Sequence, residues 1–563
     1  MTRKSPQPKS SPRFPRPLVI VVAAACLLGW FSKEIGDPDF WWHLITGEYI
    51  AARHTLPVPD PFAFTTAMAR PAYAAEARTR QFNLTHEWLA QLLMYAVYRA
   101  AGFPGIVLFR AAMLTDFCAL VGLLAYVRRR VFWAAIAAAF AAASVAHLFA
   151  ADRPYQVTFL FLALTWLLVE TRRCLWLLPP LFLVWANCHG GFFLGWVVLG
   201  AYSAEALLSR RPPGLRFAGL SVVCILICGL NPNGFRIFSA LLAYRGSFLQ
   251  SRLLEWARPS LWPPSEFSIL LIAALAAMLW AFRRVRLADW LLFAAFAAAS
   301  LTAHRNIILI GLVAPVVIVA YLPWSLRLPA WTDFALLILA AAGLAAGIAN
   351  GSVFQFHAAG WRYPAGAADF LRDHHVTQPM FNTYEFGGYL IWRLWPQERV
   401  FIDGRALSES VFSDYARILY NHDGSDGGKT ATQLLDDYGA QVILMNTFEP
   451  TNGLVYNLAP SLADPRQTTW KLVYQDPQAV LFVRNPPPGV TPLDSLQVLT
   501  HMEDECALHL EHEPQFPRCA RALGQVFSKL GDFARARKWI GEYLSRPHAA
   551  DPEAEEAYRR FSQ

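Results

Sequence analysis

The sequence predicts a polytopic α-helical membrane protein with about eleven spans, followed by a water-soluble α/β domain and a short helical tail. Of its 563 residues, 55% are hydrophobic and only 16% are charged, whereas soluble domains carry about 25% charged residues. Long apolar runs recur as far as residue 348, and short arginine-rich turns separate them. We therefore read the net charge of +8 as a membrane-topology signal and not as a sign of nucleic-acid binding.

The first apolar run, 18–30, follows a basic leader at 1–17. It resembles a signal peptide, but no small-residue cleavage site follows, so we expect a retained first span. A long polar loop, 33–86, comes next, and the segment 87–101 predicts an interfacial helix. Ten further runs can cross about 30 Å of hydrocarbon. They are 105–127, 131–149, 155–170, 174–186, 192–208, 217–230, 267–282, 288–302, 307–322 and 331–348, which completes the transmembrane domain at 18–350.

The basic turns predict the orientation of these spans. If the N-terminus is cytoplasmic, every inner loop carries arginine, as the positive-inside rule requires. These loops hold Arg128 to Arg130, Arg172 and Arg173, Arg210 and Arg211 with Arg216, Arg283 and Arg284 with Arg286, and Arg327. The same alternation places the 33–86 loop, the Gly- and Pro-rich corners and everything after residue 348 on the outer side.

The stretch directly after the first span is the strongest candidate site. Asp37 and Asp39 flank Pro38, and two tryptophans and a histidine follow at Trp41, Trp42 and His43. Charged groups at a membrane boundary need a partner, a metal or water. A helix cap by either aspartate is the structural alternative. The density of Trp, His and Asp in nine residues favours a site that faces a ligand.

Polar residues at the other predicted outer corners are further candidates, because ionisable groups at membrane depth are usually functional. Structural explanations stay open for most of them: snorkelling for the arginines, helix-to-helix hydrogen bonding for the Asn and His, and a simple turn at 231–234. The topology rule does not explain the pair at 304 and 305. The candidates are Arg153, Asn187, His189, Arg236, His304 and Arg305.

The segment 351–486 predicts an outer α/β domain, because helical and strand patterns alternate. We expect helices at 365–374 and 430–438, strands at 379–384, 389–395, 399–403 and 442–446, and a hairpin of 471–474 with 479–483. Asp403 and Arg405 follow a predicted strand, where they could bind a ligand or lock a loop.

The tail, 493–563, predicts helices at 520–530 and 533–544 joined by Gly531-Asp532, in a tetratricopeptide-like unit. Cys506 and Cys519 lie in this polar region and could form a disulfide bond. The other six cysteines lie in or beside apolar runs without ligand-type spacing.

The predicted topology and the acidic motif in the long first outer loop resemble the GT-C superfamily of membrane glycosyltransferases, which includes protein mannosyltransferases and aminoarabinose transferases. The runs 37–44 with Gly47, 57–62, 86–89, 187–191 and 384–390 resemble an uncharacterised bacterial group, over most of 17–485. The resemblance implies a multi-pass protein of the bacterial cytoplasmic membrane, with its N-terminus in the cytoplasm and its C-terminal domain outside.

The resemblance also implies a chemistry. A sugar would move from a polyprenyl-phosphate donor to a glycan, lipid or protein acceptor, with Asp37 or Asp39 as general base. An arginine would neutralise the lipid phosphate. The substrate contacts it implies are Trp41, Trp42, His43, His86, Glu87, Arg153, Asn187, His189, Arg236, His304 and Arg305. Some relatives use a divalent metal, but two carboxylates and an imidazole are not a diagnostic ligand set.

Two other classes of function stay open. A lipid or polysaccharide transporter would also place polar residues at helix breaks, although it would not need the acid pair. A non-catalytic envelope assembly protein would tolerate the loss of both aspartates. The sequence leaves the sugar, the acceptor and the oligomeric state open.

Overall fold

The computed structural model describes residues 16–561 apart from 210–213, 244–253, 324–329 and 450–451. Most of the basic leader and the predicted inner-loop residues Arg210, Arg211 and Arg327 lie outside the described residues. The chain forms two compact units. The first unit is Met1–Leu56 with Gln81–Ala358, and the second is Pro57–Arg80 with Ala359–Gln563.

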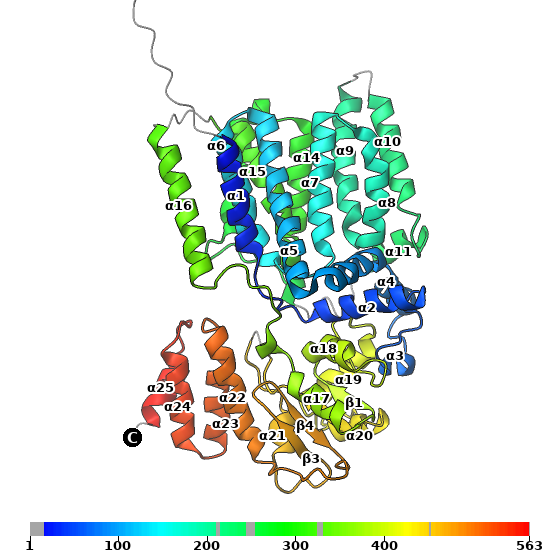
Figure 1. The fold of residues 1–563 in the computed structure, drawn as a ribbon, viewed down its shortest axis with the longest axis vertical. Coiled ribbons are helices and arrows are strands. Elements are labelled where there is room, and N and C mark those ends of the chain that lie inside the picture. Colours follow the sequence, from blue (N-terminus) through cyan, green and yellow to red (C-terminus); the bar gives the residue numbers. More distant parts are fainter. Residues whose placement is uncertain (1–15, 210–213, 244–253, 324–329, 450–451, 562–563) are drawn as a thin grey trace, which may run out of the picture. The chain divides into compact units, whose positions relative to one another are not determined.

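The first unit is a bundle of helices (Figure 1). Its helices are α1 (Arg16–Phe31), α2 (Asp39–Arg53), α5 (Trp88–Arg129), α6 (Phe132–Ala146), α7 (Tyr155–Thr171), α8 (Leu178–Cys188), α9 (Phe193–Leu208), α10 (Gly214–Ile227), α11 (Arg236–Ala243), α13 (Glu266–Trp280), α14 (Leu287–Ser300), α15 (Ile308–Tyr321) and α16 (Ala330–Ala349). The helix α4 (Glu76–Thr85) contributes residues to both units.

Each of the predicted apolar runs overlaps one helix of this unit. Five helical stretches are long and apolar enough to cross a membrane, and six apolar helices are shorter, at 10–17 residues. The multi-pass membrane class is therefore confirmed, while the number of crossings stays a prediction. The long polar loop is less irregular than expected, because α2 and α4 lie in it together with the short α3 (Thr65–Met68).

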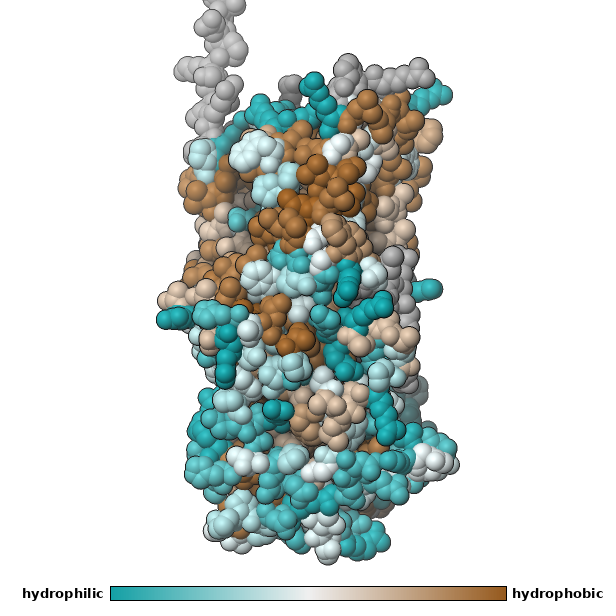
Figure 2. Space-filling view, turned by 90° about the vertical axis from the view of Figure 1, so that its right-hand side faces the viewer, coloured by the Kyte–Doolittle hydropathy of each residue, from teal (hydrophilic) through white to brown (hydrophobic). Residues whose placement is uncertain are grey.

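The surface of the bundle is apolar. Large hydrophobic side chains are exposed along α13, as at Ile272 (61%) and Trp280 (77%), and along α16, as at Leu339 (68%). Figure 2 shows the hydrophobic side chains gathered over the helices of the first unit. In water such a surface would be a large unpartnered patch, whereas in a membrane it contacts hydrocarbon.

A kink in α5 places two segments of this helix around a polar centre. Gly102 has φ +59°, in the left-handed region that a glycine adopts without strain, and Pro104 follows it. The first segment crosses α2 very closely: a Cβ added at Gly47 would lie 2.1 Å from the carbonyl oxygen of Gln91. The expected interfacial helix at 87–101 is therefore the first part of α5.

Buried charges join four helices at the end of α5 that lies farthest from this kink. Arg128 donates to Glu170 at 2.8 Å and to Asp289, and Arg286 donates to Glu170 at 2.9 Å and to Glu205 at 3.0 Å. Two of the arginines that the sequence assigned to inner loops are thus paired with acids of α7, α9 and α14.

The second unit is built around a four-stranded sheet of order β1-β2-β4-β3. The strands are β1 (Met380–Asn382), β2 (Val442–Met445), β3 (Lys471–Gln475) and β4 (Val480–Val483), where β1 and β2 are parallel and the other two pairs are antiparallel. Helices α17 (Ala365–Asp373), α18 (Tyr384–Leu394), α19 (Glu409–Leu419), α20 (Ala431–Asp437) and α21 (Leu458–Leu462) belong to the same unit. The expected hairpin, the strand at 442–446 and the helices at 365–374 and 430–438 are confirmed within one or two residues.

Two of the expected strands were wrong. The run 389–395 is part of the helix α18, whose buried side chains Phe386, Leu390 and Leu394 recur every four residues, which is a helical spacing. Gly387 lets this helix approach closely, since an added Cβ would lie 2.1 Å from the carbonyl oxygen of Ile402. The run 399–403 forms only a single bridge, between Val400 and Ala63.

The loop segment 57–80 belongs to the second unit because a buried charge triad anchors it. Arg405 donates to Asp60 at 2.8 Å and to Asp403 at 2.6 and 2.7 Å, and all three side chains are at most 3% exposed. Asp403 and Arg405 were expected either to bind a ligand or to fix a loop in place, and these contacts support the second role.

The tail contains α22 (Gln497–His512), α23 (Arg518–Lys529), α24 (Phe533–Leu544) and α25 (Pro552–Arg560). The helices α23 and α24 match the predicted helices to within two residues, and the turn at Gly531-Asp532 lies between them as expected. A disulfide bond joins Cys506 to Cys519, which confirms the pairing that the sequence left open.

Candidate functional site

The acid pair lies where α2 begins, after the end of α1. Asp37 Oδ1 accepts the backbone N–H of Asp39 at 2.9 Å, a local turn that satisfies a donor at the helix start. This turn precedes the helix, whose N-cap residue is Pro38, and no side chain caps it. The helix-cap reading is therefore not supported for either aspartate.

Arg153 binds both aspartates. Its Nε and Nη2 donate to the two oxygens of Asp37 at 2.5 and 2.9 Å, and its Nη1 lies 2.9 Å from Asp39 Oδ2. Glu255 Oε2 lies 3.9 Å from the same Nη1. A planar guanidinium that spans two carboxylates in this way fixes their positions relative to each other.

The two carboxyl groups differ in acidity. Burial alone would raise the pKa of Asp37, but the Arg153 guanidinium and the Asp39 N–H outweigh burial and hold this pKa below its usual range. At Asp39 burial dominates, so that its pKa rises to about 6 despite Arg153, and the negative charge of Asp37 adds to the rise. One acid is thus fixed as an anion, and the other is poised to take up a proton near neutral pH.

A second arginine, which the sequence did not single out, holds this arrangement in place. Arg110, near the start of the predicted span 105–127, donates to Asp152 at 2.5 Å and to the carbonyl oxygens of Phe31 (3.3 Å) and Lys33. It therefore joins the end of α1 to the residue next to Arg153 in sequence. A basic residue inside an apolar run was the available signal.

A cluster of histidines surrounds Glu87. Imidazole nitrogens of His43, His86 and His189 lie 3.7, 3.4 and 3.8 Å from its carboxylate oxygens, and Gln91 contacts His43 at 3.3 Å. Burial lowers the pKa of His43 to about 4, so this ring is neutral at pH 7. Four of the predicted site residues are thus brought together.

Asn187 and His189 are engaged in helix packing. Asn187 accepts from the Trp88 indole at 2.8 Å and donates to the carbonyl oxygens of Leu183 and Leu230, both at 2.9 Å. His189 Nδ1 accepts the N–H of Gly191 at 3.0 Å. These contacts favour the structural reading of Asn187.

The remaining predicted site residues are Arg305, His304 and Arg236, and the surroundings of each are different. Arg305 donates to Glu255 at 3.2 Å and lies over the Trp256 ring at 4.5 Å, so that Glu255 is near both Arg305 and Arg153. His304 donates its backbone N–H to Ala257 at 2.8 Å, and Arg236 is exposed at the start of α11.

The two tryptophans also differ. Trp41 is 1% exposed and packs edge-on against Phe103, with ring centroids 5.8 Å apart, so its side chain is part of the core. Trp42 is buried against the His43 ring, at 3.5 Å between centroids.

An arginine occupies the position at the acid pair that a divalent metal would take, so a metal there stays a prediction. Both aspartates are turned to the Arg153 guanidinium, which supplies the positive charge that a metal would bring. His189 Nδ1 accepts a hydrogen bond, so its Nε2 carries the proton and is not a free ligand. Among the residues that the structure describes, no three His, Cys, Asp or Glu side chains form a metal-binding group.

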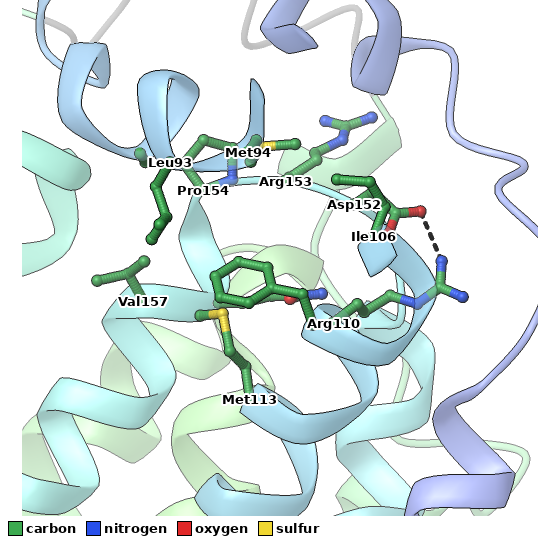
Figure 3. Close-up of a pocket in the computed structure, with 12 residues that line it drawn as sticks. Leu93, Met94, Ile106, Arg110, Met113, Asp152, Arg153, Pro154 and Val157 are labelled. Carbon is green, nitrogen blue, oxygen red and sulfur yellow. Dashed lines mark hydrogen bonds and ion pairs between the residues drawn. The ribbon is translucent and has the colours of Figure 1, made fainter. Parts of the chain in front are cut away.

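A pocket opens beside Arg153, between the two segments of α5 and the start of α7 (Figure 3). It is small and partly open to the surroundings, with a volume of about 20 Å³, which is room for about one water molecule. Its walls are mostly apolar, and Arg110, Asp152, Arg153 and Gln156 supply its polar side. The acid pair therefore has a cavity next to the arginine that binds it.

Comparison with known proteins identifies the fold. No protein-family model matches the chain, and no curated protein sequence is significantly similar to it. Its structure is similar to the archaeal oligosaccharyltransferase AglB from Archaeoglobus fulgidus in complex with an inhibitory peptide and a dolichol-phosphate, with a TM-score of 0.53 and 11% identity over 86% of this chain and 77% of that chain.

The apo form of the Archaeoglobus fulgidus oligosaccharyltransferase is also similar, with a TM-score of 0.50 and 12% identity over the same shares of the two chains. At this identity the similarity shows the fold alone, so the chain has the fold of that oligosaccharyltransferase, as the resemblance implied.

Proposed function

We propose that the protein is a membrane glycosyltransferase, which moves a sugar from a polyprenyl-phosphate-linked donor to an acceptor at the outer face of the cytoplasmic membrane. The observation that carries the proposal is the acid pair held by Arg153 at the end of α1, in a chain with the fold of an oligosaccharyltransferase. The complex of that neighbour with a dolichol-phosphate supports a donor of this class.

Asp39 is the general base of this proposal. Its pKa of about 6 makes it an anion at pH 7 that still binds a proton effectively. Asp37 is a positioning residue, because its oxygens are taken up by Arg153 and by the Asp39 N–H. The fixed anion at Asp37 also keeps Arg153 in place against Asp39.

The reaction is a single displacement. An acceptor oxygen or nitrogen attacks the anomeric carbon as its proton passes to Asp39. The bond from that carbon to the phosphate oxygen breaks, and the electron pair leaves with the polyprenyl phosphate. No covalent sugar–enzyme intermediate is needed, so one positioned carboxylate suffices and the anomeric configuration inverts.

Arg305 is our candidate for binding the lipid phosphate. Arg153 already directs its donors at two aspartates, whereas Arg305 makes a single 3.2 Å contact with Glu255 and is 32% exposed. The Trp256 ring lies 4.5 Å from its guanidinium carbon and restrains the side chain, and a guanidinium suits bidentate phosphate binding. Arg236 is the alternative on α11.

The C-terminal part of the chain supports the outer orientation. A disulfide bond such as Cys506–Cys519 forms in oxidising compartments like the periplasm. We therefore assign the domain at 351–486 and the tetratricopeptide-like tail at 493–563 to the outer side.

The direct test is to incubate the purified full-length protein with a radiolabelled polyprenyl-phosphate sugar in membranes or nanodiscs. The proposal requires labelled sugar to leave the lipid and enter an acceptor. A protein that moves the intact sugar-lipid across the bilayer without breaking the anomeric bond would be a flippase instead.

A further inference from the structure

The chain that leaves α16 passes beside the turn that carries the acid pair. The helix α16 packs on α1, where the Cys26 thiol lies 3.6 Å from the carbonyl oxygen of Ala340, and Figure 1 shows the two helices side by side. After α16 the chain runs through residues 352–358, which still belong to the first unit, before the second unit resumes. We call residues 352–358 the linker, and residues 32–36, between α1 and Asp37, the turn.

Hydrogen bonds tie the linker to the turn along its length. Gln355 donates its backbone N–H to the carbonyl oxygen of Ser32 at 2.9 Å, and its side-chain Oε1 accepts the N–H of Glu34 at 3.2 Å. Ile35 donates its N–H to the carbonyl oxygen of His357 at 3.0 Å. The backbone groups of the turn are thus satisfied by a segment more than 300 positions away in sequence, which fixes the path of the turn.

The turn is also held by α5, and it leads directly into the acid pair. Arg110 donates to the carbonyl oxygen of Lys33. Asp37 follows the turn, and its Oδ1 accepts the N–H of Asp39 at 2.9 Å. Because each residue spans at most about 3.6 Å of chain, a displacement of Ile35 reaches Asp37 two residues later.

The linker itself is held in an unfavourable backbone conformation. Phe354 has φ +57°, in the left-handed region that a bulky residue rarely adopts. Its ring packs on α1, since a Cβ added at Gly29 would lie 3.4 Å from its Cε2 atom, and it lies 5.9 Å from the Phe356 ring. Such a conformation persists only where the surroundings impose it, and such residues are concentrated at functional sites. The linker is therefore more than a slack connection.

We propose that the linker is a positioning element of the acid pair, with Gln355 as its positioning residue. Gln355 binds the turn through both its backbone N–H and its side chain. The turn in its place holds Asp37 against Arg153. The chain that leads to the second unit thus sets the geometry of the acid pair. The consequence for sugar transfer rests on the proposed function, whereas the positioning does not.

Amide hydrogen exchange of the full-length protein in nanodiscs, resolved by residue with mass spectrometry, tests the positioning without turnover. The Glu34 N–H reports the linker contact, and the Asp39 N–H reports the acid pair, because Asp37 accepts it. Gln355→Leu keeps the approximate size of the side chain and removes the oxygen that accepts from Glu34. We expect both amides to exchange about three- to ten-fold faster in this variant than in the wild type.

A second variant and a matched control complete this arm. Phe354→Gly removes the ring that packs on α1 and frees the backbone, so the same two amides should exchange faster. His357→Ala is the control. It removes an exposed side chain that pairs with Glu34 at 3.2 Å, and it keeps the carbonyl oxygen that accepts from Ile35. Exchange in this control should match the wild type.

Sugar transfer is the second arm. Gln355→Leu should lower kcat about three- to ten-fold and leave KM for the donor unchanged, because a displaced acid pair slows the proton transfer and not donor binding. A residue that only stabilises the fold would reduce the amount of active protein without changing kcat per folded molecule.

Unchanged exchange at Asp39 in folded Gln355→Leu and Phe354→Gly overturns the proposal, even where Glu34 exchanges faster, since the linker would then hold the turn alone. Faster exchange at both amides in a protein that transfers no sugar would keep the positioning role and refute the glycosyltransferase proposal.

Discussion

The guanidinium of Arg153 grips the carboxylate of Asp37 through two hydrogen bonds, of 2.5 and 2.9 Å, across 116 positions of sequence. A lysine cannot form this bidentate pair, because its ammonium group is a point charge and lacks the two parallel N–H donors of a guanidinium. We predict that Arg153→Lys lowers kcat for sugar transfer about 10- to 100-fold, the cost of losing one charge-assisted hydrogen bond.

The matched control for this variant is Arg129→Lys, which changes an exposed arginine at the C-terminal end of α5. Both proteins should be equally monodisperse and equally stable to heat. Unchanged turnover in Arg153→Lys would show that the orientation of the acid pair does not limit the reaction.

The raised pKa of Asp39 predicts a pH dependence. A base must be deprotonated to act, so the rate should be constant above pH 7 and fall as the pH drops through about 6. At lower pH the decline should approach about ten-fold per unit, as for a single group. Initial rates from pH 5 to 8 at saturating donor measure this, and a flat profile would argue against Asp39.

The buried triad of the second unit predicts a stability effect. Asp60→Ala removes one of the two acids that pair with Arg405, whose side chain is only 2% exposed. Breaking such a buried pair costs about 3–5 kcal/mol. Thermal unfolding of the full-length Asp60→Ala protein should therefore begin at a clearly lower temperature than that of the wild type. Asp437→Ala is the control, because Asp437 pairs with Lys429 on the surface, where such pairs contribute about 0–1 kcal/mol.

The topology can be tested with alkaline-phosphatase fusions, which are active only outside the cytoplasm. We predict active fusions at Gly351 and inactive fusions at Arg130 and Arg284, because arginine-rich turns stay inside. The opposite pattern would place the acid pair on the cytoplasmic face and exclude an outer-face transferase.

The helices of the bundle were predictable because hydrocarbon imposes a simple rule: each apolar run must form a helix to satisfy its own backbone. The strand expected at 389–395 shows where local pattern fails, since aromatic and branched residues favour strands, while the four-residue recurrence of Phe386, Leu390 and Leu394 decides for a helix.

The acid pair could be found from composition, because aspartates beside tryptophans at a span end are unusual. Its partner could not be assigned, since pairing Arg153 with Asp37 depends on how the turn before α7 meets the turn before α2 in the folded chain. Arg110 was hidden in an apolar run, and its role follows only from its contacts with Phe31 and Asp152.

The central claim is that Asp39 removes the proton of the acceptor, and the most direct measurement is sugar transfer by Asp39→Asn. The amide keeps the size of the side chain and its acceptor oxygen but cannot take up the proton. We predict that transfer from a polyprenyl-phosphate sugar falls about 10²- to 10⁴-fold, while donor binding and thermal stability match the wild type. The amide oxygen of Asn can still accept a hydrogen bond from Arg153 at this position, so a purely structural aspartate predicts nearly full activity. Normal transfer by folded Asp39→Asn would contradict the assignment.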